Sequence, residues 1–207
     1  SLSGDSYQIQ RRSSNGTINT VNYNVGRRTS NSTTTTTKTE SQLKNNSDFE
    51  VASITLDSHP RHAIKQLEKI IENEIKIRKV NLVGSSLGGY YATFLSEKYD
   101  LKAAMINPAV SAYKIFKNDM GININPNTQE EYIIDEDWVL ALKDIFVENL
   151  TKKNNFLVLL QTGDATLNYK FSELYYEGCN LSIDNGGSHS FDNLESKLPA
   201  MLLHFSN

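Results

Sequence analysis

Three side chains in this sequence have the chemistry of a nucleophile, an acid and a base, and they occur in the order Ser86, Asp164 and His189. A serine hydroxyl is a poor nucleophile until a base removes its proton, and imidazole suits that role because its pKa lies near neutrality. A carboxylate then orients the imidazole and stabilises its protonated form. The three residues therefore predict acyl transfer through a covalent acyl-serine intermediate.

Ser86 is the central residue of the segment Gly-Ser-Ser-Leu-Gly (84–88), which fits the nucleophile-elbow pattern G-x-S-x-G. The pattern is informative only between a strand and a helix. Here an apolar strand is expected over 80–83 and a helix over 87–99. Glycines at both ends of the pattern leave room in a crowded turn, and the free N–H groups at the helix N-terminus favour negative charge. We expect Ser86 to stand at the tip of this turn.

The acid has two alternatives. Asp184 precedes His189 on the same expected loop, where it can shape a turn, and Asp192 can cap or charge the last helix. Asp164 could itself act only as a helix cap. We favour Asp164 as the acid because it follows the penultimate expected strand, whereas His189 follows the last one.

Other interpretations compete with the elbow. Ser85 is an alternative nucleophile, although the pattern places Ser86 at its centre. A glycine-rich turn could also bind a phosphate, but this leaves the acid and the base unexplained. His59 and His62 are three residues apart and could suggest a metal, but histidines at the start of an amphipathic helix are more often surface residues. We expect no metal.

From residue 49 onward, apolar segments with strand and helix periodicity alternate. The first expected helix should be capped by Asp57 or Ser58, with Pro60 in its first turn. The expected strands cover 49–56, 80–83, 102–106, 156–160 and 180–183, and the expected helices cover 57–75, 87–99, 137–150, 167–176 and 191–205.

This alternation predicts an α/β fold, with a mainly parallel central sheet and helices on both faces. In such sheets, ligands bind beyond the carboxyl ends of the strands. Ser86, Asn107, Asp164 and His189 each follow an expected strand. One fold therefore brings all four residues to one edge.

Composition limits the class of protein. The 207 residues suit one domain with a sizeable core, and a net charge of −3 gives no reason to expect nucleic acid as a partner. No apolar run approaches a membrane span. The single cysteine, Cys179, excludes an internal disulfide and suits a reducing compartment, so we expect a cytoplasmic protein. Composition does not indicate an oligomeric state.

Residues 1–48 differ from the rest because they are rich in Ser, Thr and Asn. We expect residues 1–22 to form a polar extension that is disordered or contains a short hairpin. The strands of this hairpin would be 7–10 and 17–25, on either side of an Asn-Gly turn at 15–16. Residues 23–207 would form the single domain, with an atypical first loop over 23–48.

Four segments together resemble the YqiA type of small bacterial esterase. They are Val-Gly-Ser-Ser-Leu-Gly-Gly-Tyr-Tyr-Ala (83–92), Ile-Asn-Pro-Ala-Val (106–110), Leu-Gln-Thr-Gly-Asp (160–164) and Gly-Gly-Ser-His-Ser-Phe (186–191). The resemblance covers about 49–205. It implies a single-domain α/β-hydrolase with little or no cap, a Ser86–Asp164–His189 triad, small acyl ester or thioester substrates, and no cofactor.

The resemblance also gives expectations for the rest of the site. The backbone N–H of Leu87 and that of Arg27 would form the oxyanion hole, and Asn107 and Pro108 would line the substrate pocket. The first loop departs from the family, because Val25 and Arg27 stand where the family usually has His and Phe. The alternative function is therefore a catalytically weak or inactive α/β-hydrolase-fold protein with a binding role.

The acid loop departs from the family as well. Ala165 and Asn168 stand where the family usually carries acidic residues. The three triad positions are present despite this change.

Overall fold

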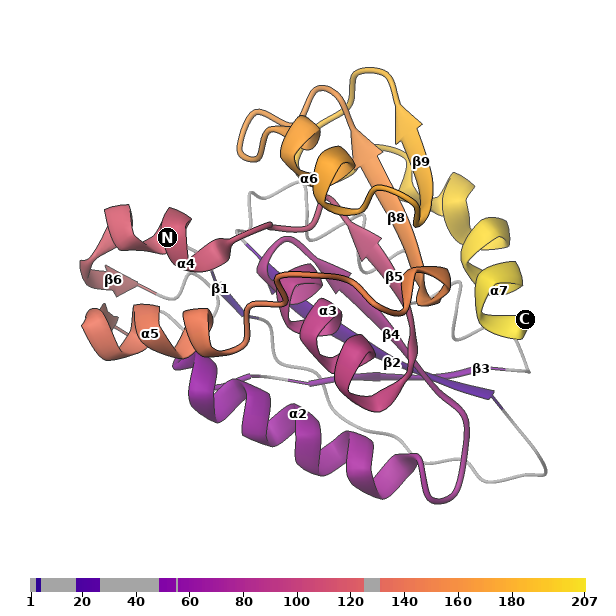
Figure 1. Ribbon diagram of the computed structural model, residues 1–207, viewed down its shortest axis with the longest axis horizontal. Helices are drawn as coiled ribbons and strands as arrows, with labels where there is room; N and C mark the ends of the chain where they lie inside the picture. Colours follow the sequence, from indigo (N-terminus) through magenta and orange to yellow (C-terminus); the bar gives the residue numbers. More distant parts are fainter. Residues whose placement is uncertain (1–2, 5–17, 27–48, 55, 125–130) are drawn as a thin grey trace.

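The structure, a computed structural model, describes residues 3–4, 18–26, 49–54, 56–124 and 131–207 (Figure 1). Short 3₁₀ turns occupy Lys117–Asp119, Lys153–Asn155 and Leu194–Lys197. The strands are β1 (Ser3–Gly4), β2 (Ile18–Gly26), β3 (Phe49–Ser53), β4 (Val80–Ser85), β5 (Lys102–Ile106), β6 (Gly121–Ile124), β7 (Glu131–Ile134), β8 (Phe156–Gln161) and β9 (Asn180–Asp184), and the helices are α2 (Pro60–Glu74), α3 (Leu87–Tyr99), α4 (Ala112–Phe116), α5 (Glu136–Asp144), α6 (Tyr169–Tyr175) and α7 (Leu198–Ser206).

The central sheet is parallel from β2 through β4, β5 and β8 to β9. On the other side of β2, residues 18–22 pair with β3 in parallel and residues 25–26 pair with β1 in antiparallel orientation. This arrangement confirms the predicted α/β class with a mainly parallel sheet. The expected division between residues 22 and 23 falls inside β2, and the expected strand over 7–10 lies outside the described residues.

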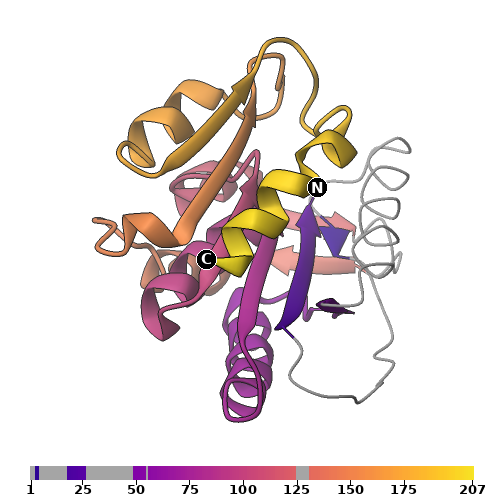
Figure 2. The ribbon, with the colours of Figure 1, turned by 90° about the vertical axis from the view of Figure 1, so that its right-hand side faces the viewer.

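Strands β4, β5 and β8 are buried on both faces of the sheet, as strands of a covered parallel sheet are. Side chains alternate between two apolar clusters; in β5, Ala103 and Met105 face one cluster and Ala104 and Ile106 face the other. The first cluster lies under α2 to α6. The second lies under α7, which crosses the opposite face of the sheet (Figure 2).

Helix α7 is held to the sheet by side chains with no exposed surface, including Met201 and Phe205. Removing the ring of a buried phenylalanine costs about 3–5 kcal/mol. The last helix is shorter than expected: a 3₁₀ turn covers 194–197 and the α-helix begins at Leu198, with Pro199 in its first turn. Proline has no backbone N–H to donate, so it favours the start of a helix over its interior.

Two other helix ends differ from expectation. The N-cap of α2 is His59, whose Nδ1 accepts a hydrogen bond from the Arg61 N–H at 3.3 Å, whereas Asp57, two residues earlier, accepts the His59 N–H. Helix α5 ends at Asp144, well before the expected residue 150. Its apolar periodicity continues through Phe146, but this ring packs against tyrosines of other elements instead of extending the helix.

The connection from β5 to β8 contains α4, α5 and the antiparallel pair β6–β7. It is joined to α2 by an ion pair between Asp137 and Arg61 at 3.1 Å, and Asp137 also lies 3.3 Å from Nε2 of the N-cap residue His59. Across the described ranges, no helix has both the length and the apolar character needed to cross a bilayer.

Candidate active site

The turn between β4 and α3 holds Ser86 in a conformation that few non-glycine residues adopt, with φ 53° and ψ −120°. Such backbone strain persists only where the surroundings enforce it. The Ser86 N–H donates to the Ile106 carbonyl at 3.1 Å, and the Ser86 carbonyl accepts from the Ala109 N–H at 3.0 Å. A side chain at Gly84 would come within 2.4 Å of the Gly88 carbonyl oxygen, so this position requires glycine. The elbow is therefore fixed to the end of β5.

The structure brings Ser86, His189 and Asp164 together. His189 Nε2 lies 3.0 Å from Ser86 Oγ, and His189 Nδ1 lies 2.7 Å from Asp164 Oδ2. An ionised carboxylate can only accept hydrogen bonds, so Nδ1 carries the proton and Nε2 is left to accept from the serine hydroxyl. The side chains of Asp164 and His189 are 2% and 13% exposed. The arrangement has the geometry of a nucleophile, a base and an orienting acid.

Asp164 uses its two oxygens for different tasks. Oδ2 faces His189, whereas Oδ1 accepts the backbone N–H groups of Thr166 and Leu167, each at 2.8 Å. The helix-cap interpretation of Asp164 and its interpretation as the acid are thus compatible. Because three donors surround the buried carboxylate, its orientation is fixed by the protein itself.

The two alternative acids have other partners. Asp184 Oδ1 lies 2.5 Å from Lys197 Nζ, and Asp192 Oδ1 accepts the Ser188 hydroxyl at 2.6 Å. Within the described residues, neither carboxylate hydrogen-bonds to His189.

The region expected to form the oxyanion hole is described only in part. Leu87 is the first residue of α3, so its N–H belongs to the end of the helix that favours negative charge. Strand β2 pairs in parallel with β4, with Asn24 opposite Ser85, so its carboxyl end at Gly26 lies beside the elbow. Arg27, the expected second donor, lies outside the described residues.

Asn107 and Pro108 lie next to the triad, but their visible contacts are with the protein. The Asn107 side-chain amide donates to the Ser188 and His189 carbonyls and accepts from the Gln161 N–H. The Pro108 carbonyl accepts the Ser172 hydroxyl at 3.0 Å. Contact of Asn107 and Pro108 with a substrate stays a prediction.

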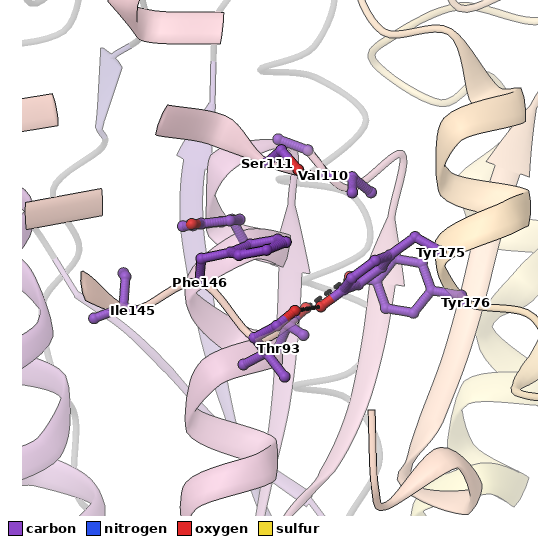
Figure 3. A pocket seen from close by; sticks show the side chains of 10 residues that line it. Thr93, Val110, Ser111, Ile145, Phe146, Tyr175 and Tyr176 are labelled. Atoms are coloured by element: carbon purple, nitrogen blue, oxygen red, sulfur yellow. Dashed lines mark hydrogen bonds between the residues drawn. The ribbon is translucent and has the colours of Figure 1, made fainter. Parts of the chain in front are cut away.

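A narrow pocket lies beside α3 (Figure 3). Three of its hydroxyl groups form hydrogen bonds within the protein: Thr93 Oγ1 is 2.6 Å from Tyr176 Oη, and Tyr90 Oη donates to the Leu142 carbonyl. Burial raises the pKa of both tyrosines, so they remain neutral. The pocket contacts the elbow through Tyr90 but is lined by no triad residue. Its lining consists of Tyr90, Thr93, Ala109, Val110, Ser111, Ile145, Phe146, Val147, Tyr175 and Tyr176.

No group of three His, Cys, Asp or Glu residues in the described part of the chain is arranged to hold a metal ion. His59 and His62 instead contact carboxylates, Asp137 at 3.3 Å and Asp57 at 3.5 Å.

Gln161 is a candidate functional residue that the sequence analysis missed. It ends the otherwise apolar strand β8, and its side chain is buried against the loop that carries His189. A polar side chain closing a fully buried strand was the available signal.

Comparisons with known proteins agree with this architecture. The sequence pattern of the uncharacterised protein family UPF0227 matches residues 31–206. Est1E from Butyrivibrio proteoclasticus superposes with a TM-score of 0.63 at 13% identity, covering 93% of this chain and 89% of that one. The esterase EaEST from Exiguobacterium antarcticum gives 0.59 at 10% identity, with 93% of each chain covered.

A third similar structure is the H243A variant of tomato methylketone synthase I, solved in complex with β-ketoheptanoate. It gives a TM-score of 0.61 at 13% identity, covering 94% of this chain and 99% of that one. At these identities the likeness establishes the α/β-hydrolase fold and leaves the reaction open.

Proposed function

The chain belongs to the uncharacterised protein family UPF0227, and we propose that it is a serine hydrolase that cleaves small acyl esters or thioesters. Membership confirms the family predicted from the four sequence segments. The observation that carries the proposal is the contact series from Ser86 Oγ through His189 to the buried carboxylate of Asp164. The esterases among the similar structures support an ester as the substrate class.

In the proposed reaction, Ser86 Oγ attacks the acyl carbon while His189 Nε2 takes its proton. Asp164 keeps Nδ1 protonated and stabilises the imidazolium. His189 then gives the proton to the leaving alcohol or thiol, and an acyl-Ser86 ester remains. Water, deprotonated by His189, hydrolyses that ester and restores the enzyme.

The developing oxyanion needs donors that are already in place. The Leu87 N–H at the start of α3 is the first, and we assign the second to the backbone after Gly26, at Arg27. A backbone donor survives a change of side chain provided that the loop keeps its path. Because Val25 and Arg27 replace the usual His and Phe, a slow enzyme is the alternative form of this proposal.

A fluorophosphonate probe tests the proposal, because it reports an activated serine without knowledge of the substrate. We expect a single labelled peptide that contains Ser86, and no labelling in Ser86→Ala. Ser85→Ala is the matched control, since it removes the neighbouring hydroxyl from the same turn, and it should label as the parent does. An unlabelled parent, or labelling at Ser85, would contradict the proposal.

A further inference from the structure

The loop that carries His189 contains several residues with positive φ, a backbone conformation that is unfavourable for non-glycine residues. Phe191 and Asn193 have φ of 64° and 60°, in the left-handed region, and Gly186 and Gly187 have φ of 78° and 77°. Non-glycine residues are strained there, so contacts from outside the loop must hold it in place. Two buried amide side chains supply those contacts.

The first amide belongs to Gln161, at the carboxyl end of β8. Its Oε1 accepts the Ser188 N–H at 3.0 Å and the Asp192 N–H at 2.8 Å, and its Nε2 donates to the Asp192 carbonyl at 2.8 Å. The Gln161 side chain therefore hydrogen-bonds to the loop on both sides of His189. The fit is close, because a Cβ on Gly187 would lie 2.0 Å from Gln161 Oε1.

The second amide belongs to Asn107, at the carboxyl end of β5. Its Nδ2 donates to the Ser188 carbonyl at 3.0 Å and to the His189 carbonyl at 3.2 Å. Its Oδ1 accepts the Gln161 N–H at 3.0 Å, which links the two amides. Both side chains are buried, with Asn107 2% and Gln161 4% exposed.

We propose that Asn107 and Gln161 are positioning residues that together form an amide clamp, which holds His189 Nε2 in line with Ser86 Oγ. The inference rests on the proposed serine-hydrolase function and deepens it. Asp164 fixes the imidazole ring through Nδ1, whereas the amide clamp fixes the backbone from which the ring projects.

The chemistry of an amide suits this task. Each amide offers both donors and acceptors, so it can satisfy N–H and carbonyl groups of the same loop. It also carries no charge.

The expected effect follows from geometry. A displacement of about 1 Å in a catalytic group costs on the order of 10²-fold in rate. We therefore expect Gln161→Leu to lower kcat by about 10²-fold on p-nitrophenyl acetate and to leave KM within about twofold. The fluorophosphonate labelling rate at Ser86 should fall in parallel.

The matched control is Asn81, another buried amide in the same sheet. It has no exposed surface, and within the described residues its side chain has no hydrogen-bond partner. Asn81→Leu removes a buried amide without touching the loop and should leave kcat unchanged. Gln161→Glu is the conservative variant: it keeps acceptors for Ser188 and Asp192 and should recover part of the activity lost in Gln161→Leu.

Near-UV circular dichroism checks the fold of each variant. If Gln161→Leu does not fold, Gln161→Glu and the isosteric Asn107→Asp carry the test, because both keep the acceptor oxygen of the amide and replace its donor group by a carboxylate oxygen. We expect either variant to lower kcat and the labelling rate relative to Asn81→Leu. Equal rates in these variants and the control would overturn the amide clamp.

A readout without turnover separates this inference from the proposed function. In ¹⁵N NMR, the imidazole resonances of His189 should shift or broaden in the folded Gln161 and Asn107 variants and stay as in the parent in Asn81→Leu. If the parent does not react with the fluorophosphonate but the His189 resonances still shift in the variants, the hydrolase proposal is refuted and the positioning role stands. If the His189 resonances do not shift in these variants, the amide clamp is refuted, even when the parent reacts with the fluorophosphonate.

Discussion

The two ends of the parallel sheet are built differently. At the carboxyl end, strained backbone gathers: Ser86, Asn107, Ser111, Phe191 and Asn193 all have positive φ. The contacts that hold this end include hydrogen bonds between buried neutral amides and backbone groups. At this end the backbone is strained, which costs free energy, and the side chains are held in fixed positions.

The amino end relies on charge and on common helix caps. Glu97, near the end of α3, accepts the N–H groups of Thr151 and Lys152, each at 2.9 Å, as well as the Thr151 hydroxyl. Asp100 ends α3 in the left-handed conformation and accepts the Asn155 side chain at 2.9 Å. These contacts join a loop to a helix, and no triad residue takes part in them. We therefore expect mutations at the carboxyl end to lower the proposed catalytic activity first, and mutations at the amino end to lower stability alone.

The largest expected effect is at the acid. Asp164→Asn should lower kcat by about 10⁴-fold, because the amide favours the wrong tautomer of His189, while the fold is kept. Steady-state kinetics on an ester measures the loss. Asp184→Asn is the matched control, since Asp184 pairs with Lys197 and should matter little. The opposite ranking of the two variants would show that the acid was assigned to the wrong carboxylate.

Gly163→Ala tests the crowding at the same end. An added Cβ would lie 2.4 Å from the Gly187 carbonyl oxygen, between the loop of the acid and the loop of the base. Overpacking of this kind costs about 1–3 kcal/mol, and we expect kcat to fall by roughly 10²-fold as the loops separate. Urea denaturation and kinetics measure the two effects. A stable variant with full activity would mean that the loops shift freely, contrary to the comparison.

Glu97→Ala tests the amino end. Loss of the carboxylate leaves the Thr151 and Lys152 N–H groups without their acceptor, and hydrogen bonds to charged groups contribute about 1.5–3 kcal/mol. We expect the free energy of unfolding, measured by urea denaturation, to fall by an amount of this order, reduced by the partial exposure of the site. The kcat should stay as in the parent. A large fall in kcat in the folded variant would break the distinction between the two ends.

The smallest effect is a pH dependence at His204, whose Nε2 donates to the Asn155 carbonyl at 3.0 Å. Burial lowers the pKa of His204 from its usual 6.5. The folded protein therefore binds this proton less readily than the unfolded chain. Its contribution to stability is complete above pH 6.5 and is lost as the pH falls through the two pKa values.

The free energy of unfolding should thus fall less steeply from pH 7 to pH 5 in His204→Gln than in the parent. Glutamine can keep the hydrogen bond to Asn155 and does not titrate. Urea titrations at several pH values measure the difference, and the histidines common to both proteins cancel in it. Parallel curves would show that His204 protonates equally in both states.

Much of the carboxyl end could be predicted from sequence because its signals are local. The strand 102–106 and the helix 87–99 coincide with β5 and α3, since a short apolar run and the glycine turn act on neighbouring residues. The order of the triad along the chain then fixed which strand ends must meet. That part of the site needed only the topology of a parallel sheet.

The parts that could not be predicted depend on distant contacts. Helix α5 ends early because Phe146 packs on Tyr113 and Tyr175, which no spacing within the helix reveals. Gln161 reaches Ser188 and Asp192, 27 and 31 residues further along the chain. A glutamine at the end of a strand looks the same in sequence whether it faces water or holds a loop.

Because β9 lies at the edge of the sheet and late in the sequence, the site is assembled only near the end of synthesis. Ser86 and His189 are 103 residues apart, and β9, which leads into the His189 loop, joins the sheet through β8. At about 5–20 residues per second of synthesis, the elbow precedes its base by roughly 5–20 s. During that interval the serine is chemically ordinary. On the proposed function, Ser86 becomes reactive only after the last strand docks, so a covalent serine probe would report the completion of folding.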